Sequence, residues 1–325
     1  MLGDSIAYCH KLENDSVFMT KRRLIIATRE SALALKQAEW VKMALLSHHP
    51  HLSITFLGMT TEADKHLDIT LTEIGGKGLF VKALEEALLD KRADIAVHSM
   101  KDVPMDLPEG LCIPVVTERE DPRDVFVSNR YQSLAQLKSG AMIGTSSLRR
   151  QTQLRAIRRD LNFQDLRGNL HTRLKCLSAG DVDAIILAAA GLKRLDLNNH
   201  IKAYFSTDDM LPAAGQGALG IECRDDDEGL LKLIAPLNHD ASYHAIIAER
   251  ALCRTLQGGC KVPIAAYATI HHHVLTLQGL VSNRQGTRLL RAKREDDVRH
   301  AEDMGKRVAK ELLQLGAEKI LREFL

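Results

Sequence analysis

Aromatic residues are scarce in this chain. They make up 4% of its 325 positions, and Trp40 is the single tryptophan. A flat aromatic platform for stacking nucleic-acid bases is therefore not expected. The longest apolar run, residues 184–192, is far shorter than the roughly 20 residues that a membrane-spanning helix needs. Residues 1–20 have no apolar central stretch, so they do not resemble a secretory signal, and we expect a mobile tail there.

An excess of either charge is also lacking. The 44 basic and 42 acidic residues give a net charge of +2, which does not demand nucleic acid or an anionic membrane as a partner. The six cysteines include no C-x-x-C pair, which disfavours zinc ribbons and thioredoxin-like redox centres, and no metal site is predicted. Without an export signal, the sequence predicts a cytoplasmic protein with reduced thiols.

The rest of the composition, 45% hydrophobic and 26% charged, is typical of globular proteins, and the length exceeds that of one ordinary core. Strand-like and helix-like patterns alternate along residues 24–117, which predicts βαβ units and a mostly parallel sheet. The pattern restarts after the charged segment 118–123. A small-residue loop at 211–217 precedes a strand, 220–223, that could return to the first sheet. From about residue 240, a helix, three strands and a long helix predict a small α+β domain.

Basic and hydroxyl side chains follow several of these strands. The segment Gly144-Thr-Ser-Ser-Leu-Arg-Arg150 lies where a strand turns into a helix, and helix N-termini attract anions. Arginine binds carboxylates in a fork, and ligands of parallel sheets bind at the carboxyl ends of strands. Similar segments contain Arg29 with Ser31, Arg167 with Arg173, and Lys193 with Arg194. Each alone also fits a capped helix with solvated arginines, but together they predict a ligand with several carboxylates.

The segment 97–104 places Lys101 and Asp102 just after a buried strand and before a proline. A carboxylate among lysine and arginines stays ionised, so Asp102 could stabilise a cation or transfer a proton. The alternative is a surface ion pair, which contributes little to stability. The position at the carboxyl end of a strand favours a functional role.

Two glycine-containing segments present single reactive side chains. Gly75-Gly-Lys77-Gly78 is not a phosphate loop, and it could be a lid that contains Lys77 or a tight turn. Gly258-Gly-Cys260-Lys261 exposes a cysteine beside a lysine that favours the thiolate. The remaining cysteines are expected to be inert, in apolar elements or in the tail: Cys9, Cys112, Cys176, Cys223 and Cys253.

Together these segments resemble the hydroxymethylbilane synthase (porphobilinogen deaminase) family. The resemblance runs in order from about residue 22 to the C-terminus, and no single short pattern accounts for it. The matching stretches are IATRES at 26–31, GGKGLF at 75–80, ADIAVHSMKDVP at 93–104, EREDPRD at 118–124, GTSSLRRQ at 144–151, LRGN at 166–169, TR at 172–173, DAIILAAAGLKRL at 183–195, GQGALGIE at 215–222 and GGCKVPI at 258–264.

The resemblance implies an α/β fold with two periplasmic-binding-protein-like βαβ domains, joined by two chain crossovers, and a small C-terminal α+β domain. We expect a mobile tail at 1–20, a first domain of 21–117 and 218–236, a second of 118–217 and a third of 237–325. The third domain would contain the cysteine to which the cofactor is attached.

The resemblance also implies a transferase of porphyrin (haem) biosynthesis. Enzymes of this family join four porphobilinogens head to tail and release one ammonia at each addition. The chain grows on a dipyrromethane cofactor, bound through a thioether that would fall on Cys260, and hydrolysis then releases hydroxymethylbilane. Asp102 matches the catalytic aspartate. The partner would be the small-molecule substrate alone, without nucleic acid or membrane, and we expect a monomer.

Each pyrrole has an acetate and a propionate, which explains the many basic residues. The resemblance implies that these carboxylates are bound by Arg29, Ser31, Lys101, Thr145, Ser146, Ser147, Arg149, Arg150, Arg167, Arg173, Arg194 and Gln216. The sequence departs from the family pattern at Glu62, Ala63, His171 and Lys261.

Two other functions fit parts of the sequence. A non-catalytic two-lobed carboxylate-binding protein would share the first two domains, but it would not need Asp102 or a cysteine-bearing third domain. An acyl or CoA transferase with Cys260 as its nucleophile would require a histidine base, and no histidine lies near Cys260 in the sequence.

Overall fold

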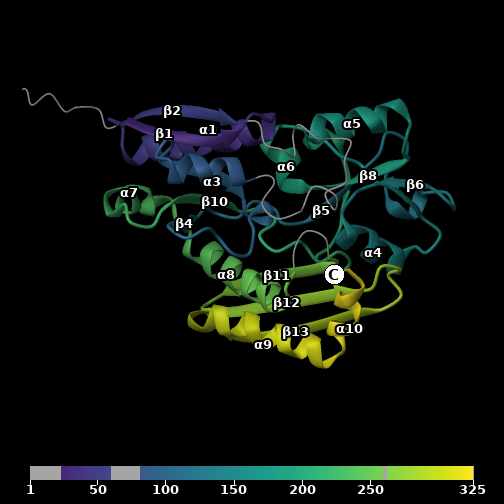
Figure 1. The fold of residues 1–325 in the computed structure, drawn as a ribbon. Helices are drawn as coiled ribbons and strands as arrows, with labels where there is room; N and C mark the ends of the chain where they lie inside the picture. Colours follow the sequence, from purple (N-terminus) through teal and green to yellow (C-terminus); the bar gives the residue numbers. More distant parts are fainter. Residues whose placement is uncertain (1–22, 60–80, 259–261, 325) are drawn as a thin grey trace, which may run out of the picture.

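The computed structural model describes residues 23–59, 81–258 and 262–324 (Figure 1). The expected tail, Lys77, Cys260 and the departures at Glu62, Ala63 and Lys261 lie outside these described residues. Among the described residues, no helix is both long and apolar enough to cross a membrane.

The first lobe is built on a five-stranded sheet. Its strands, in spatial order, are β2 (Ser53–Met59), β1 (Arg23–Arg29), β3 (Ile95–Ser99), β10 (Leu219–Arg224) and β4 (Leu111–Val116). Helices α1 (Ala32–His48) and α7 (Glu228–Ile234) pack on one face, and α3 (Lys82–Leu89) packs on the other. Helix α1 buries Ala38, Val41 and Leu45, whose spacing of three and four residues places them on one apolar face.

The second lobe repeats this arrangement. Its strands, in spatial order, are β7 (Asn162–Gln164), β6 (Met142–Gly144), β8 (Ala184–Ala188), β5 (Asp124–Val127) and β9 (Ile201–Tyr204). Helix α4 (Leu148–Ile157) packs on one face, and α5 (Leu170–Ala179) and α6 (Ala189–Arg194) pack on the other. Figure 1 shows the two lobes side by side.

The prediction of a mostly parallel first sheet is wrong for two of its four strand pairs. Strand β1 is parallel to β2 and β3, but β10 is antiparallel to both of its neighbours. The second sheet has the same pattern, with β5 antiparallel to β8 and β9. Strands β10 and β5 are the two strands that the chain enters directly from the other lobe, and this entry sets their direction.

The third sheet is small and antiparallel, in the order β11 (Ile264–His271), β12 (Val274–Ser282) and β13 (Leu289–Asp297). Helices α8 (Asp240–Thr255), α9 (Ala301–Gln314) and α10 (Ala317–Leu321) share one apolar cluster with it. Gly305 permits the close crossing of α9 over α8, because a Cβ there would lie 2.7 Å from the Ala251 Cβ. Short 3-10 helices complete the fold: η1 (Met100–Asp102), η2 (Leu134–Gln136), η3 (Asn198–His200), η4 (Ala235–Leu237), η5 (Val298–His300) and η6 (Arg322–Phe324).

One buried ion pair joins all three parts of the molecule. Arg119, in the first crossover, donates from Nη1 to Glu249 Oε1 at 2.6 Å and from Nε to the Gln216 carbonyl oxygen at 2.8 Å. The Glu249 carboxylate, on α8, also accepts hydrogen bonds from the backbone N–H groups of Gly215 and Ala268. Arg119 Nη2 adds a fourth contact, to Glu249 Oε2 at 3.2 Å, so this carboxylate links the crossovers to the third sheet.

Candidate active site

The end of β3 positions Lys101 and Asp102. Both lie on η1, directly after the strand, and the backbone N–H of Met100 is bonded to the carbonyl of Ala218 at 3.0 Å. Gly215 allows this close approach, because its φ is +77° and a Cβ there would lie 2.9 Å from the Met100 carbonyl carbon. The Asp102 side chain is exposed, whereas Lys101 is half-buried. A ligand can therefore reach the Asp102 carboxylate from solvent.

The matching turn of the second lobe runs from β6 into α4. The Ser146 hydroxyl donates to the carbonyl of Leu166 at 2.7 Å, and the backbone N–H of Ser147 donates to Thr145 Oγ1 at 3.3 Å. Ser147 occupies the N-cap position of α4, but its hydroxyl makes no capping hydrogen bond. The structure thus places Ser147 at a helix N-terminus, as predicted, without using its side chain to satisfy the helix.

Arg149 and Arg150 are more buried than the sequence indicated, with exposed fractions of 5% and 6%. Their common partner is Asp124, the first residue of β5. Arg149 Nη1 lies 2.7 Å from Asp124 Oδ2, and Arg150 Nη2 lies 2.7 Å from Oδ1. Burial alone would raise the pKa of Asp124, but the charges of the two arginines outweigh it and hold that pKa well below its usual range.

Asp124 is the site residue that the sequence analysis missed. It stands at the end of a charged segment, and only the apolar run Val125–Val127 after it indicates that a buried strand begins there. Gln216 completes its surroundings, because Gln216 Nε2 donates to Asp124 Oδ1 at 3.1 Å and to the carbonyl of Pro122 at 2.6 Å. The Gln216 Oε1 atom is buried and has no hydrogen-bond partner.

Positive charge accumulates where the two lobes meet. Burial lowers the pKa of Lys101 to about 8, and although Asp102 opposes this shift, the charges of Arg150 and Arg149 add to it. Burial also lowers the pKa of Arg173 to about 10, and Arg150 contributes to that shift. Because these groups lie in different lobes yet shift one another, the structure brings Lys101, Asp102, Arg149, Arg150 and Arg173 into one cluster.

Arg194 has the same character at the end of α6. Burial lowers its pKa to about 10, against the opposing charge of Glu120, and its Nη2 donates to the carbonyl of Gly217 at 2.6 Å. The lowered pKa values of Lys101, Arg173 and Arg194 indicate that nearby acidic groups do not fully offset the desolvation of these half-buried charges. A bound polyanion would compensate them.

The remaining predicted residues lie at the expected strand and helix ends. Ser31 caps α1, where its Oγ accepts a hydrogen bond from the N–H of Ala34 at 3.3 Å. Arg29 ends β1, and Arg167 precedes α5; both are half-buried. The first turn of α1 approaches α6 of the other lobe, because a Cβ at Gly191 would lie 3.7 Å from the Leu33 side chain. The N-terminus of α1 is therefore close to the helix that ends in Arg194.

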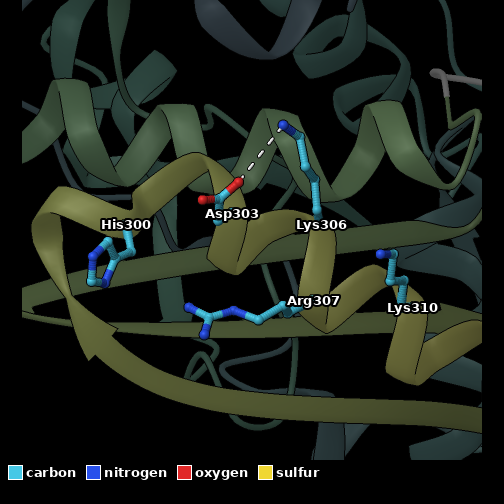
Figure 2. Close-up of a pocket in the computed structure, with 5 residues that line it drawn as sticks. All are labelled: His300, Asp303, Lys306, Arg307 and Lys310. Atoms are coloured by element: carbon cyan, nitrogen blue, oxygen red, sulfur yellow. Dashed lines mark ion pairs between the residues drawn. The ribbon is translucent and has the colours of Figure 1, made fainter.

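A basic hollow of about 430 Å³ lies elsewhere, along η5 and helix α9 (Figure 2). Its lining consists of His300, Asp303, Lys306, Arg307 and Lys310. Lys306 pairs with Asp303 at 3.9 Å, and Arg307 pairs with Asp296 of β13. None of the predicted site residues lines this hollow, so it is not the candidate active site.

Two family models match the chain. The model of the porphobilinogen deaminase dipyromethane cofactor binding domain matches residues 24–232, and that of the porphobilinogen deaminase C-terminal domain matches residues 243–314. The chain is 51% identical over 300 residues to the porphobilinogen deaminase of Laribacter hongkongensis (strain HLHK9), which covers 92% of this chain and 97% of that protein.

Solved structures of binding proteins also align with part of this chain. A putative methionine-binding lipoprotein from Bacillus subtilis aligns with a TM-score of 0.43 and 16% identity, over 67% of this chain and 90% of that one. A periplasmic substrate-binding protein of an ABC transporter from Coxiella burnetii aligns with a TM-score of 0.43 and 15% identity, over 68% of this chain and 94% of that one.

Proposed function

This chain belongs to the porphobilinogen deaminase family, and from that premise we propose which of its residues perform the reaction. Its function is that of a porphobilinogen deaminase, a transferase of tetrapyrrole biosynthesis with a dipyrromethane-cofactor-binding domain. We assign the active site to the cluster around Asp102 and Arg150. The observation on which this assignment depends is that Lys101 and Asp102, on the turn after β3, lie close enough to Arg149, Arg150 and Arg173 of the other lobe for their charges to influence one another.

The basic cluster fits the cofactor. A dipyrromethane has four carboxylates, two on each ring, and arginine forks suit such groups. Carboxylates bound beside Lys101, Arg173 and Arg194 would supply the compensation that these cations lack. When bound, the cofactor supplies the acceptor to which the first substrate is joined. Lys101 and the arginines bind and orient carboxylates, and the hydroxyl of Ser147 at the N-terminus of α4 adds a donor.

Asp102 is the catalytic residue in this assignment. Loss of ammonia from porphobilinogen leaves a cationic azafulvenium, and a fixed carboxylate stabilises such a charge as it develops. Asp102 is exposed at the end of β3, and Lys101 precedes it on the same turn. Its carboxylate can also accept a hydrogen bond from a pyrrole N–H and hold a proton in transit.

Cys260 is the proposed attachment point of the cofactor. It follows Gly258 and precedes Val262 in the sequence, between α8 and β11. Tethering keeps each later addition effectively intramolecular, which favours the reaction over diffusion of a free intermediate. Lys77 is proposed to lie on a lid over the site. We further propose three domains with the boundaries given above, a monomer, and a cytoplasmic location.

Intact mass spectrometry tests the attachment. The purified protein should exceed its sequence mass by one dipyrromethane, and peptide mapping should place the adduct on Cys260. Cys260→Ser should have the bare sequence mass and essentially no activity, whereas the matched control Cys176→Ser should keep the adduct. An active protein with the bare mass, or an adduct on another cysteine, would contradict the assignment.

A further inference from the structure

Two cysteines that the active site does not use lie opposite each other in the first sheet. Cys112 on β4 and Cys223 on β10 are direct partners in the antiparallel register. Directly opposed residues of antiparallel strands have Cα atoms about 4.5–5.5 Å apart, which is within the range of about 4.4–6.8 Å that a disulfide requires. The register shifts between Ile221 and Cys223, and such an irregularity lets the strands adjust locally.

Both thiols point into the same apolar cluster and are free. Cys223 is fully buried within that cluster, and Cys112 packs against it with part of its surface exposed. The other described cysteines, Cys176 and Cys253, are associated with the clusters of the second lobe and of the third sheet. Among the described residues, each thiol of the pair therefore has the other as its nearest candidate for cross-linking.

The two thiols also interact directly. A hydrogen bond from Cys223 lowers the pKa of Cys112, against the opposing effect of burial. The same interaction, together with burial, raises the pKa of Cys223 well above its usual range. The half-exposed Cys112 is thus the better nucleophile of the two. Cys223 is buried and protonated, and it can react only after Cys112 has been modified.

We propose that Cys112 and Cys223 are a reversible redox site, which a low-molecular-weight disulfide converts into a Cys112–Cys223 disulfide. The Cys112 thiolate attacks one sulfur of the oxidant and expels the first thiol, which leaves a mixed disulfide on Cys112. Cys223 then attacks the Cys112 sulfur and expels the second thiol, to which its proton passes. The protein loses two hydrogens and two electrons, and the oxidant is reduced to two thiols.

The cross-link would enclose the whole second lobe in one covalent loop. The chain leaves the first sheet after β4, forms the second sheet, and returns as β10. A disulfide between these strands closes a loop that contains both crossovers, and long closed loops restrict the unfolded chain most. The oxidised protein should therefore unfold at a higher temperature than the reduced protein.

The test uses the cofactor-loaded protein and glutathione disulfide. After incubation, free thiols are blocked under denaturing conditions, and peptides are mapped without reduction. We expect a linked peptide pair that contains Cys112 and Cys223, the loss of two blockable thiols, a Tm several degrees higher, and reversal of all three by dithiothreitol. Cys112→Val should show none of these changes, while the matched control Cys176→Ser should behave like the natural protein.

Three results would overturn the proposal. The first is that Cys112 and Cys223 both remain free thiols, and are still blocked, after a treatment with glutathione disulfide that oxidises other cysteines of the chain. The second is a glutathione adduct that persists on Cys112 while Cys223 stays free. The third is a cross-link from either cysteine to a different partner. A Cys112–Cys223 cross-link that leaves Tm unchanged would overturn the inferred effect on stability.

Discussion

The Arg150 guanidinium approaches the Asp124 carboxylate side-on, with Nε at 3.0 Å and Nη2 at 2.7 Å from the same oxygen, Oδ1. Its third contact, from Nη1 to the carbonyl of Ile186 at 2.9 Å, fixes the plane of the group. The orientation of the Arg150 guanidinium is therefore set by a carboxylate that was absent from the sequence-based site. Asp124 acts as a positioning residue for both arginines.

Replacement of Asp124 by asparagine should destabilise the protein strongly. Two buried guanidinium groups would lose their counter-charge, and breaking a buried ion pair from one side typically costs about 3–5 kcal/mol. Urea unfolding of Asp124→Asn measures this loss. Asp160→Asn is the matched control, because Asp160 also pairs with an arginine, at 2.6 Å, but at the surface. The control should unfold at nearly the same urea concentration as the natural protein; equal losses in both variants would contradict the role of burial.

The contribution of Asp124 should depend on pH. Its folded-state pKa is depressed, so its stabilising effect is fully present above the unfolded-state pKa of about 3.9 and is lost as pH falls towards the folded-state value. The difference in unfolding free energy between the natural protein and Asp124→Asn should be constant from pH 7 to about 5 and should shrink below about 4. A difference that grows on acidification would show that the carboxylate is not held ionised in the folded protein.

Asp102→Asn should fold normally and lose most turnover. The side chain is exposed, so the fold does not depend on its charge, but the developing cation loses its stabilising carboxylate. Removal of one such electrostatic partner typically lowers kcat by roughly 100-fold or more. Asp106→Asn is the control, since Asp106 is a nearby exposed carboxylate that pairs with Arg254 at 3.2 Å. Near-normal turnover of Asp102→Asn would remove Asp102 from the mechanism.

The decrease of kcat/KM at alkaline pH should reflect the deprotonation of Lys101. The lysine is charged below its pKa, which burial lowers to about 8, so kcat/KM should fall as pH rises beyond about 8. Carboxylates bound nearby would move this limit upward. Lys101→Arg should shift the falling limb to higher pH, because the guanidinium stays protonated. Lys193→Arg serves as the control, and its kcat/KM should fall at the same pH as that of the natural protein. If kcat/KM of Lys101→Arg falls at the same pH as in the natural protein, the fall is caused by the deprotonation of another group.

Local patterns predicted the elements of the fold well. The alternating strand-like and helix-like patterns of residues 24–117 correspond to real elements, beginning with β1 and α1. Strand direction was not predictable in this way, because β10 and β5 take theirs from the crossovers rather than from their own residues. The sequence analysis did not predict strand β5, because Asp124 directly follows the charged segment 118–123.

The same limit applies to the candidate site. Strand-end position predicted a group of basic residues, because the carboxyl ends of parallel strands share one edge of a sheet, and in the structure Lys101, Arg149, Arg150 and Arg173 influence one another's pKa. It could not show that Arg149 and Arg150 are oriented by Asp124, since that partner comes from a strand at a different place in the sheet. The pairing of Cys112 with Cys223 was hidden for a similar reason: an entire lobe separates the two residues in the sequence.

The two crossovers are bonded to each other as well as to Glu249. The N–H of Thr117 donates to the carbonyl of Leu219 at 3.0 Å, and the N–H of Glu120 donates to that of Gly217 at 3.2 Å. Because two hydrogen-bonded segments connect the lobes, a rotation of one lobe against the other would have to break these hydrogen bonds. The crossovers therefore act as a double connection that sets how Asp102 in one lobe faces Arg149 and Arg150 in the other.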